Sequence, residues 1–432
     1  MADTYFCGLR ATGDLVTNEL ADNWRAGILR IFPNGMAPLT GLTALMTSEK
    51  LTEGPHYHWW TKTLTTQRAT VTGIYTDAAL GTAYTSGGVA GSILYVKMSE
   101  ADSAYFRAGH QVLLRDASDY NVDVNAKVLS VTANGASSYI VVRLLEADDN
   151  ATATSHDLSD ADTCLIVGNI NPQGGTRPEA ITQGPTEFSN YTQIFRNSLD
   201  LARTLMQTRL RTGDAYQEAK KGALEQHSIE MEKAFFWGIQ SSNTGANGKP
   251  ETTTDGIVPL IKTYGTANDY SLNTSYSGKT WLDGGADWLD EQLEVIFRYG
   301  SQERLGFAGS GALLGIQKLV KELGFYTVNA QTTSFGMRVL EWVTPFGSLT
   351  LKTHPLFSYE PTNRNSIVLL EPSNIRYRFI QDTTFKQDKS DTEGGGTGVD
   401  GKSEEFLTEA GLELHFPNTC GYLNGVGLDS VV

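Results

Sequence analysis

The spacing of hydrophobic and polar residues changes several times along the chain. Residues 1–45 mix small, polar and turn-forming residues, and Pro33, Gly35, Pro38 and Gly41 interrupt any long periodic element. We therefore expect an extended N-terminal arm. Because this arm carries large apolar side chains, among them Trp24, it is too hydrophobic to remain solvated and should lie on another protein surface.

The next stretch favours strands. Residues 56–72 are rich in aromatic and β-branched side chains, whereas 169–190 is rich in Pro and Gly and reads as extended. We interpret 46–73 and 169–190 as the outgoing and returning strands of one long excursion. Residues 74–168 between them contain short strand-like runs that predict a small inserted all-β barrel or sandwich. These runs are 92–98, 111–116, 122–132, 138–145 and 163–167, with a hairpin turn at Asn134-Gly135.

A helical period begins near residue 214. Asp214, followed three residues later by Gln217, resembles a capping box, and Gly238 stands where a helix commonly ends. The pattern predicts one long helix over about 214–237. Its apolar face, which should form the core-facing side, runs through Ala223 and Leu224, Met231 and Phe235, and we assign Leu224, Met231 and Phe235 to the core.

The remainder of the chain combines helices and strands. Apolar residues at helical spacing predict amphipathic helices at 286–298 and 311–323. Alternating or continuous apolar runs then predict strands, at 338–343, 348–353, 366–370, 374–380 and 406–416. The fold class is α+β.

Composition points toward protein contacts and away from nucleic-acid recognition. Charged residues make up 19% of the 432 positions, below the globular average of about 25%, and interface cores are depleted in charge. The net charge is −15, which repels phosphate and disfavours sequence-specific binding of DNA or RNA. No apolar run is long enough to span a membrane, and the start has no secretory leader pattern, so we expect synthesis in the cytosol.

The sequence contains no motif that requires a catalytic function. Residues 396–403 match the phosphate-binding pattern GxxxxGK[ST], which ends in Lys402 and Ser403. Such a site needs an apolar strand directly before it, and none precedes this segment. We therefore interpret the segment as a Gly-rich surface loop. His56 and His58 could be two metal ligands on one strand face, yet beside Trp59 and Trp60 an aromatic contact surface is the better interpretation. The three cysteines are widely spaced and contain no CxxC. We predict no catalytic residues, no metal site and no cofactor.

The order of these elements and four local stretches resemble a known family. The stretches are NYTQIF (190–195), IEMEKAFFWG (229–238), SFGMRVLEWVTPFGSLTLKTHPLF (334–357) and FLTEAGLELHFPNTCGYLNGV (406–426). The chain resembles a tailed-bacteriophage major capsid protein of the Johnson fold. That resemblance implies an N-arm (1–45), an E-loop (46–73 and 169–190) carrying the 74–168 insertion, a P-domain (191–282 and 381–432) with a spine helix, and an A-domain (283–380).

The resemblance also implies a function. Such subunits assemble into the hexamers and pentamers of an icosahedral head that encloses double-stranded DNA, with no membrane and no catalysis, alongside separate scaffolding, portal and decoration proteins. Trp24, Trp59 and Trp60 become expected subunit contacts. A local basic cluster joins them, which could touch packaged DNA, a scaffold or acidic groups of the same chain: Arg196, Arg203, Arg209 and Arg211.

Two other functions stay open at this point. The inserted β domain could make the chain a virion decoration or adhesion protein that binds a receptor. A nucleotide hydrolase using Lys402 is the enzyme alternative.

Overall fold

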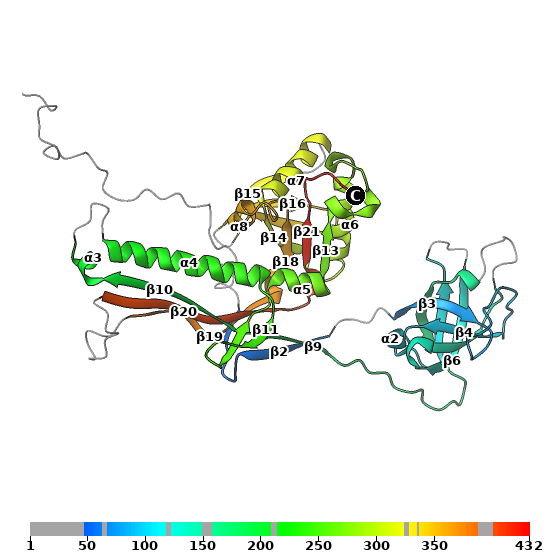
Figure 1. Ribbon diagram of the computed structural model, residues 1–432. Helices are drawn as coiled ribbons and strands as arrows, with labels where there is room; N and C mark the ends of the chain where they lie inside the picture. Colours follow the sequence, from blue (N-terminus) through cyan, green and yellow to red (C-terminus); the bar gives the residue numbers. More distant parts are fainter. Residues whose placement is uncertain are drawn as a thin grey trace, which may run out of the picture. The chain divides into compact units, whose positions relative to one another are not determined.

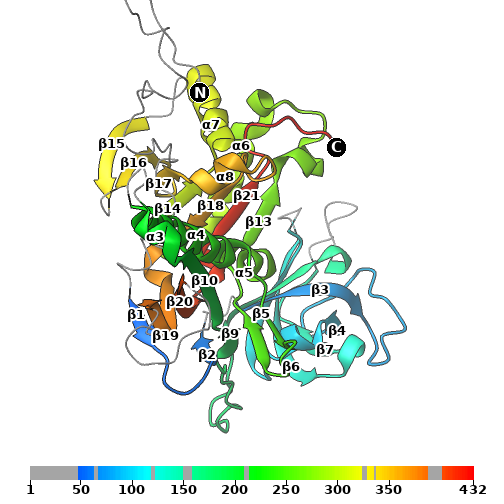
Figure 2. The same cartoon turned by 60° about the vertical axis from the view of Figure 1, so that its left-hand side comes forward.

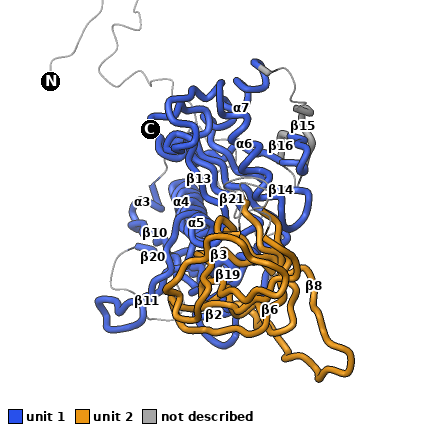
Figure 3. Tube along the Cα trace, turned by 90° about the vertical axis from the view of Figure 1, so that its right-hand side faces the viewer, with its two compact units in different colours: residues 1–59, 187–432 blue, residues 60–186 orange. Residues whose placement is uncertain are grey.

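The computed structural model describes residues 47–62, 67–117, 122–148, 158–208, 214–323, 328–334, 337–387 and 401–432. The chain divides into two compact units. One consists of residues up to Trp59 together with Glu187–Val432, and the other of Trp60–Thr186 (Figure 3). Two crossings of the chain therefore connect the units.

The smaller unit contains a closed β-barrel. Its strands, in order around the barrel, are β3 (Arg68–Tyr75), β4 (Ile93–Met98), β7 (Tyr139–Leu144), β6 (Asp123–Thr132), β5 (His110–Arg115) and β8 (Thr163–Asn169). Alternate residues point inward and fill the barrel, so that Val96, Val112, Val128 and Val142 are completely buried. A short helix, α2 (Glu100–Ser103), follows β4.

Strand β3 lies outside the segment in which the sequence places the insertion. It begins at Arg68, whereas the predicted insertion begins at 74 and assigns these residues to the long excursion. The aromatic and β-branched run at 56–72 hides this boundary, because it reads as one strand although residues 56–61 and 68–75 belong to different sheets. The turn between β6 and β7 lies where it is predicted, and Gly135 adopts the left-handed φ of +53°.

The larger unit contains a long, narrow four-stranded sheet. Its order is β1 (Ser48–Lys50), β19 (Ile375–Lys386), β20 (Gly401–Leu414) and β10 (Gln193–Ala202). Strands β10 and β20 are antiparallel and stay paired from Gln193 opposite Ala410 to Ala202 opposite Gly401. Figures 1 and 2 show helix α4 (Ala215–Trp237) lying along these two strands.

Helix α4 begins and ends for local reasons. The Asp214 carboxylate accepts a hydrogen bond from the Tyr216 backbone N–H at 2.9 Å, which caps the first turn as the sequence predicts. The helix ends at Gly238 because the chain is crowded there. A Cβ at Gly238 would lie 2.5 Å from the Ala234 carbonyl oxygen and 2.6 Å from that of Thr254, and its φ of −59° shows that close approach, not a left-handed turn, requires glycine.

One stripe of α4 faces the four-stranded sheet. Ala223, His227, Met231 and Phe235, four residues apart, are buried, and the Phe235 ring packs edge-on against Phe195 and Tyr377. The prediction that Leu224 belongs to this stripe is wrong, because its side chain is 42% exposed. Leu224 is one residue, or 100° of helical rotation, from Ala223, and Ala223 takes the buried position.

A seven-stranded sheet forms the second layer of this unit. Its order is β13 (Thr266–Asp269), β21 (Gly421–Asn424), β18 (Ile367–Leu370), β14 (Glu303–Ala308), β17 (Ser348–Thr353), β16 (Met337–Val343) and β15 (Val328–Ser334). Helices α6 (Trp281–Phe297) and α7 (Ser310–Leu323) pack on one face (Figure 1). Strand β18 is buried on both faces, since Ile367 and Leu369 face these helices while Val368 and Leu370 face the core beside α4.

The sheets do not follow the predicted division at 282/283 and 380/381. Strand β19 starts at Ile375 and pairs with β20, so it leaves the predicted A-domain segment early, and β13 and β21 join the seven-stranded sheet from outside that segment. The connections in which the chain moves from one sheet to the other are short, and the spacing of apolar residues does not reveal where they lie. The remaining elements are α3 (Arg203–Gln207), β11 (Ser241–Thr244), β12 (Pro250–Thr253), α5 (Ile257–Tyr264), α8 (Pro355–Tyr359) and the ribbon strands described below.

The buried stripe of α4 gives a direct test of this packing. Met231→Asp would place a carboxylate among apolar side chains, which costs several kcal/mol and approaches a domain's whole stability of about 5–15 kcal/mol. Leu224→Asp makes the same chemical change on the exposed side and should change the free energy of unfolding by less than about 1 kcal/mol. Urea unfolding of the two variants measures the difference, and equal destabilisation by both would contradict the assigned face.

Candidate functional site

The residues expected to make subunit contacts fall into different surroundings. Trp24, Arg209 and Arg211 lie outside the described residues. Trp59 and Trp60 lie in β2 (His56–Thr61), which pairs with β9 (Thr186–Tyr191) in a separate two-stranded ribbon. Alternate side chains of β2 are buried and exposed, so neighbouring tryptophans point to opposite sides.

The two tryptophans have different roles. Trp59 is 5% exposed, and its ring stacks on Phe188 and His415 at centroid distances of 5.9 and 6.4 Å. It packs within its own chain, so its assignment as a surface contact is wrong; the letter pattern WW does not reveal which of two adjacent residues points inward. Trp60 is 64% exposed and stays a candidate contact.

His56 and His58 lie on the exposed face of the same strand. Their rings are 4.2 Å apart, the His56 ring stacks on Tyr191, and His58 Nδ1 lies 2.6 Å from a Glu187 carboxylate oxygen. Partial burial, with the neighbouring His58, lowers the pKa of His56. In the described part of the chain, no three His, Cys, Asp or Glu side chains come together as metal ligands.

A buried amide fixes the base of the β2–β9 ribbon. The Asn190 side-chain nitrogen donates to the Leu412 carbonyl oxygen at 2.9 Å, and its side-chain oxygen accepts from the Asp255 and Tyr191 backbone N–H groups at 2.7 and 2.8 Å. The Tyr57 hydroxyl donates to the same Leu412 oxygen at 2.8 Å. This junction cannot be predicted from local sequence, because the residues that meet there are distant in the chain and no local motif marks them.

Asp255 adds a titratable group to that junction. Burial raises the pKa of its carboxyl to about 6, although hydrogen bonds from the Gln240 and Gly256 backbone N–H groups oppose the shift. A group with a raised native pKa binds its proton more tightly in the folded chain than in the unfolded one. The ionised form at neutral pH is therefore a destabilising element at the base of the ribbon.

The basic cluster is partly neutralised within the chain. Arg196 on β10 forms a hydrogen-bonded ion pair with Glu405 on the neighbouring strand β20, at 2.5 Å, and Lys386 lies 3.5 Å from the same carboxylate. The hydrogen bond from Arg196 lowers the pKa of Glu405. Arg203 begins α3, and its side chain is exposed. Arg196 thus fits the interpretation of a salt bridge to the chain's own acids.

A second buried feature connects α4 to the seven-stranded sheet. His354 Nε2 lies 2.9 Å from a Glu232 carboxylate oxygen, and both side chains are completely buried. The imidazole is surrounded by Phe236, Phe307 and Phe357 at centroid distances of 4.6 to 5.7 Å. Because a buried charge without a partner is costly, this pair ties the helix to the sheet in one specific arrangement.

The part of the phosphate-binding pattern that the structure describes, residues 401–403, is strand. Lys402 and Ser403 lie in strand β20, opposite Leu201 and Asp200 of β10, whereas a cradle would place them at the start of a helix. The Lys402 ammonium lies 5.9 Å from the Tyr216 ring centroid. The predicted surface loop is wrong for residues 401–403, which are strand, while 388–400 lie outside the described residues.

Comparison with known proteins decides the family. A family model for the SU10 major capsid protein matches residues 10–427. The chain belongs to the SU10 major capsid protein family. The major capsid protein of Pseudomonas phage PaMx41 is 26% identical over 414 residues, which cover 92% of this chain and 91% of that protein.

Similar solved structures also come from phages. A structure from Microbacterium phage Oxtober96 matches 95% of this chain and 94% of its own, with 11% identity and a TM-score of 0.42. A structure from Mycobacterium phage Bobi matches 96% and 98%, with 8% identity and a TM-score of 0.43. With TM-scores this low, the assignment rests on the family model.

Membership of this family confirms the resemblance seen in the sequence. The protein is a major capsid protein, a structural component of the phage virion that associates with copies of itself. The decoration and nucleotide-hydrolase alternatives are not favoured. None of the helices in the described ranges is long and apolar enough to cross a membrane.

The raised pKa of Asp255 predicts a pH-dependent variant. Between pH 6 and pH 4 the folded chain takes up a proton that the unfolded chain does not, so stability from this group is present below about pH 4 and is lost as the pH rises through 6. Asp255→Asn should therefore stabilise the subunit at pH 8, by about 1–2 kcal/mol after allowance for solvent screening.

Urea unfolding at pH 8 and at pH 4 measures this effect. At pH 4 the Asp255→Asn variant and the natural chain should be nearly equal in stability. Glu53→Gln, which removes an exposed carboxylate, is the control for net charge and should change little at either pH. Destabilisation by Asp255→Asn at pH 8 would show that the ionised carboxylate is favourable.

Proposed function

We propose that this major capsid protein forms the hexamers and pentamers of an icosahedral head around double-stranded DNA and has no catalytic role. The β2–β9 ribbon is the observation that carries the proposal. A two-stranded ribbon is at best marginally stable by itself, and this one exposes His56, His58 and Trp60 along one face of β2. Copies of the subunit that pack against the ribbon would cover this face and its strand edges.

The region around α4 supports contacts of the same kind. The outer side of the helix exposes Leu224, and strand β10 exposes Ile194, which is 55% exposed. These are two separate exposed apolar side chains, and exposed apolar groups of this kind gain stability when a neighbouring copy covers them. We therefore assign the ribbon to the E-loop and α4 to the spine helix of a P-domain, with the seven-stranded sheet and its helices as the A-domain and residues 1–45 as the N-arm.

The charge of the subunit suits a container for DNA. A net charge of −15, repeated in every copy of the shell, opposes tight non-specific binding of the packaged duplex. Separate scaffolding, portal and decoration proteins complete the head in this proposal, which places assembly in the cytoplasm of the bacterial host.

Electron microscopy tests the proposal. The purified chain, alone or with its phage's scaffolding protein, should form closed shells in negative-stain images. Trp60→Ala should leave the subunit folded, since the side chain is exposed, but should reduce shell yield at least about tenfold because a large aromatic contact is lost. Trp60→Phe keeps an aromatic ring and should largely restore the yield.

Two results would contradict the proposal. Wild-type protein that remains monomeric in analytical ultracentrifugation, with and without the scaffold, would argue against self-assembly. Trp60→Ala that forms shells as well as the natural chain would remove the β2–β9 ribbon from the subunit interface.

A further inference from the structure

Two histidines of the β2–β9 ribbon are placed as a metal-binding pair. His56 and His58 are the exposed histidines among the described residues, and their rings lie on one face of β2 with centroids 4.2 Å apart. Two imidazole nitrogens that bind one zinc ion at about 2.0–2.1 Å each lie roughly 3.3 Å from each other. Rings at this separation, inclined to each other by 61°, can present their nitrogens to a single ion.

Strand β9 orients both rings. A Glu187 carboxylate oxygen lies 2.6 Å from His58 Nδ1, and because an ionised carboxylate only accepts hydrogen bonds, Nδ1 carries the proton. The neutral His58 ring then has its lone pair on Nε2, which points away from Glu187. Tyr191, on the same face of β9, stacks on the His56 ring at a centroid distance of 4.3 Å. A carboxylate behind a ligand ring is typical of metal-binding histidines, because it fixes their tautomer and orientation. The sequence predicts no metal site, since it does not show these two side chains of β9.

The nitrogens that a metal needs are available in this pair. No described residue is hydrogen-bonded to the ring nitrogens of His56, and the side chain of His58 is 39% exposed. The other described histidines lack this freedom, because each is buried or already bonded to a neighbouring side chain: His110, His227, His354 and His415.

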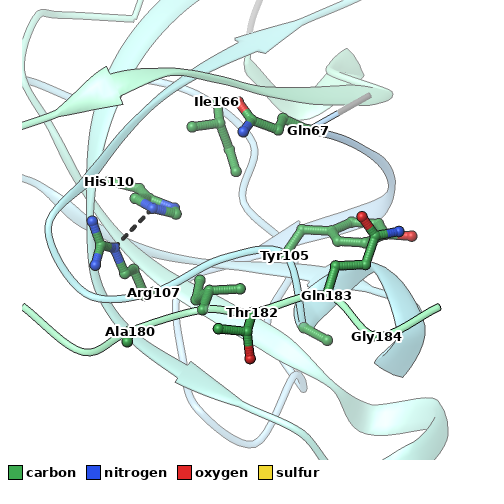
Figure 4. A pocket seen from close by; sticks show the side chains of 11 residues that line it. Gln67, Tyr105, Arg107, His110, Ile166, Ala180, Thr182, Gln183 and Gly184 are labelled. Atoms are coloured by element: carbon green, nitrogen blue, oxygen red, sulfur yellow. Dashed lines mark hydrogen bonds between the residues drawn. The ribbon is translucent and has the colours of Figure 1, made fainter. Parts of the chain in front are cut away.

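His110 in the β-barrel shows the opposite arrangement. It lines a cavity of about 640 Å³ together with Arg107, whose Nε–H donates to His110 Nε2 at 3.1 Å (Figure 4). That hydrogen bond uses the lone pair of the ring, and the guanidinium charge repels a cation. The cavity is therefore unsuited to a metal ion, whereas the ribbon supplies two imidazoles and a negative charge.

We propose that His56 and His58 bind one divalent transition-metal ion on the exposed face of the β2–β9 ribbon, with Glu187 as the positioning residue. Imidazole nitrogens favour Zn²⁺, Ni²⁺ and Cu²⁺ over Mg²⁺ and Ca²⁺, which prefer oxygen ligands. The described residues offer no third ligand, so water completes the coordination in the separate subunit. The site lies within one chain and does not depend on how the subunits assemble.

Isothermal titration calorimetry of the untagged, full-length subunit with zinc chloride tests the proposal. One Zn²⁺ should bind per chain, and His56→Asn and His58→Asn should each weaken binding at least about tenfold, because each leaves a single imidazole ligand. An excess of Mg²⁺ should not compete. With Cu²⁺ in place of Zn²⁺, electron paramagnetic resonance should show two nitrogen ligands in the natural chain and one in either variant.

Glu187→Gln tests the positioning role. The glutamine keeps an acceptor for the His58 Nδ1–H group but loses the charge, so Zn²⁺ binding should weaken about tenfold while the copper spectrum still shows two nitrogen ligands. Glu53→Gln, which removes an exposed carboxylate three residues before His56, is the matched control and should leave binding unchanged.

Several results would overturn the inference. Absence of zinc binding, or binding that is unchanged in both histidine variants, would remove the metal from this pair. Equal losses in Glu187→Gln and Glu53→Gln would indicate general charge attraction, and displacement of zinc by Mg²⁺ would place the ion on carboxylates. Circular dichroism checks that each variant is folded, which these exposed positions should permit.

Discussion

Helix α4 has to pack against two sheets at once, and the larger unit is organised around that constraint. Along most of its length, one stripe with a four-residue repeat lies on the four-stranded sheet. In its last turns a second set of side chains is also buried. Glu232 pairs with His354, and Phe236 packs edge-on against Phe307 and Phe357 of the neighbouring layer. A shift of the helix along either sheet would separate the buried pair.

The base of the β2–β9 ribbon lies beside the end of the same helix. Gly238 approaches the Thr254 carbonyl oxygen so closely that no side chain fits. The next residue, Asp255, donates its backbone N–H to Asn190 at the end of β9. The position of the ribbon base therefore depends on where α4 stops, while its exposed face remains available to other molecules. The end of α4 therefore connects the packed core of the larger unit to the β2–β9 ribbon that extends from it.

The sequence predicted what local patterns encode. Asp214 and the uninterrupted period that follows it located α4, and alternating residues located most barrel strands. It could not predict that Trp59 is buried while Trp60 is exposed, because a strand's direction is set by its partner β9. It also missed the pairing of Glu232 with His354 and the role of Asn190, whose partners lie far away in the chain. The expected role of Leu224 failed for a related reason, since a helical period fixes a stripe only to within about one residue.

Hydrogen–deuterium exchange of the dissociated subunit and of the assembled particle shows whether assembly completes the β2–β9 ribbon. Backbone amides of α4 and β20 should exchange slowly in both states, because their hydrogen bonds and packing lie within one chain. Amides of β2 and β9 distal to Asn190 should exchange rapidly in the subunit and slowly in the particle, where neighbouring copies cover them. Equal protection of the ribbon in both states would contradict the claim that it is completed by assembly.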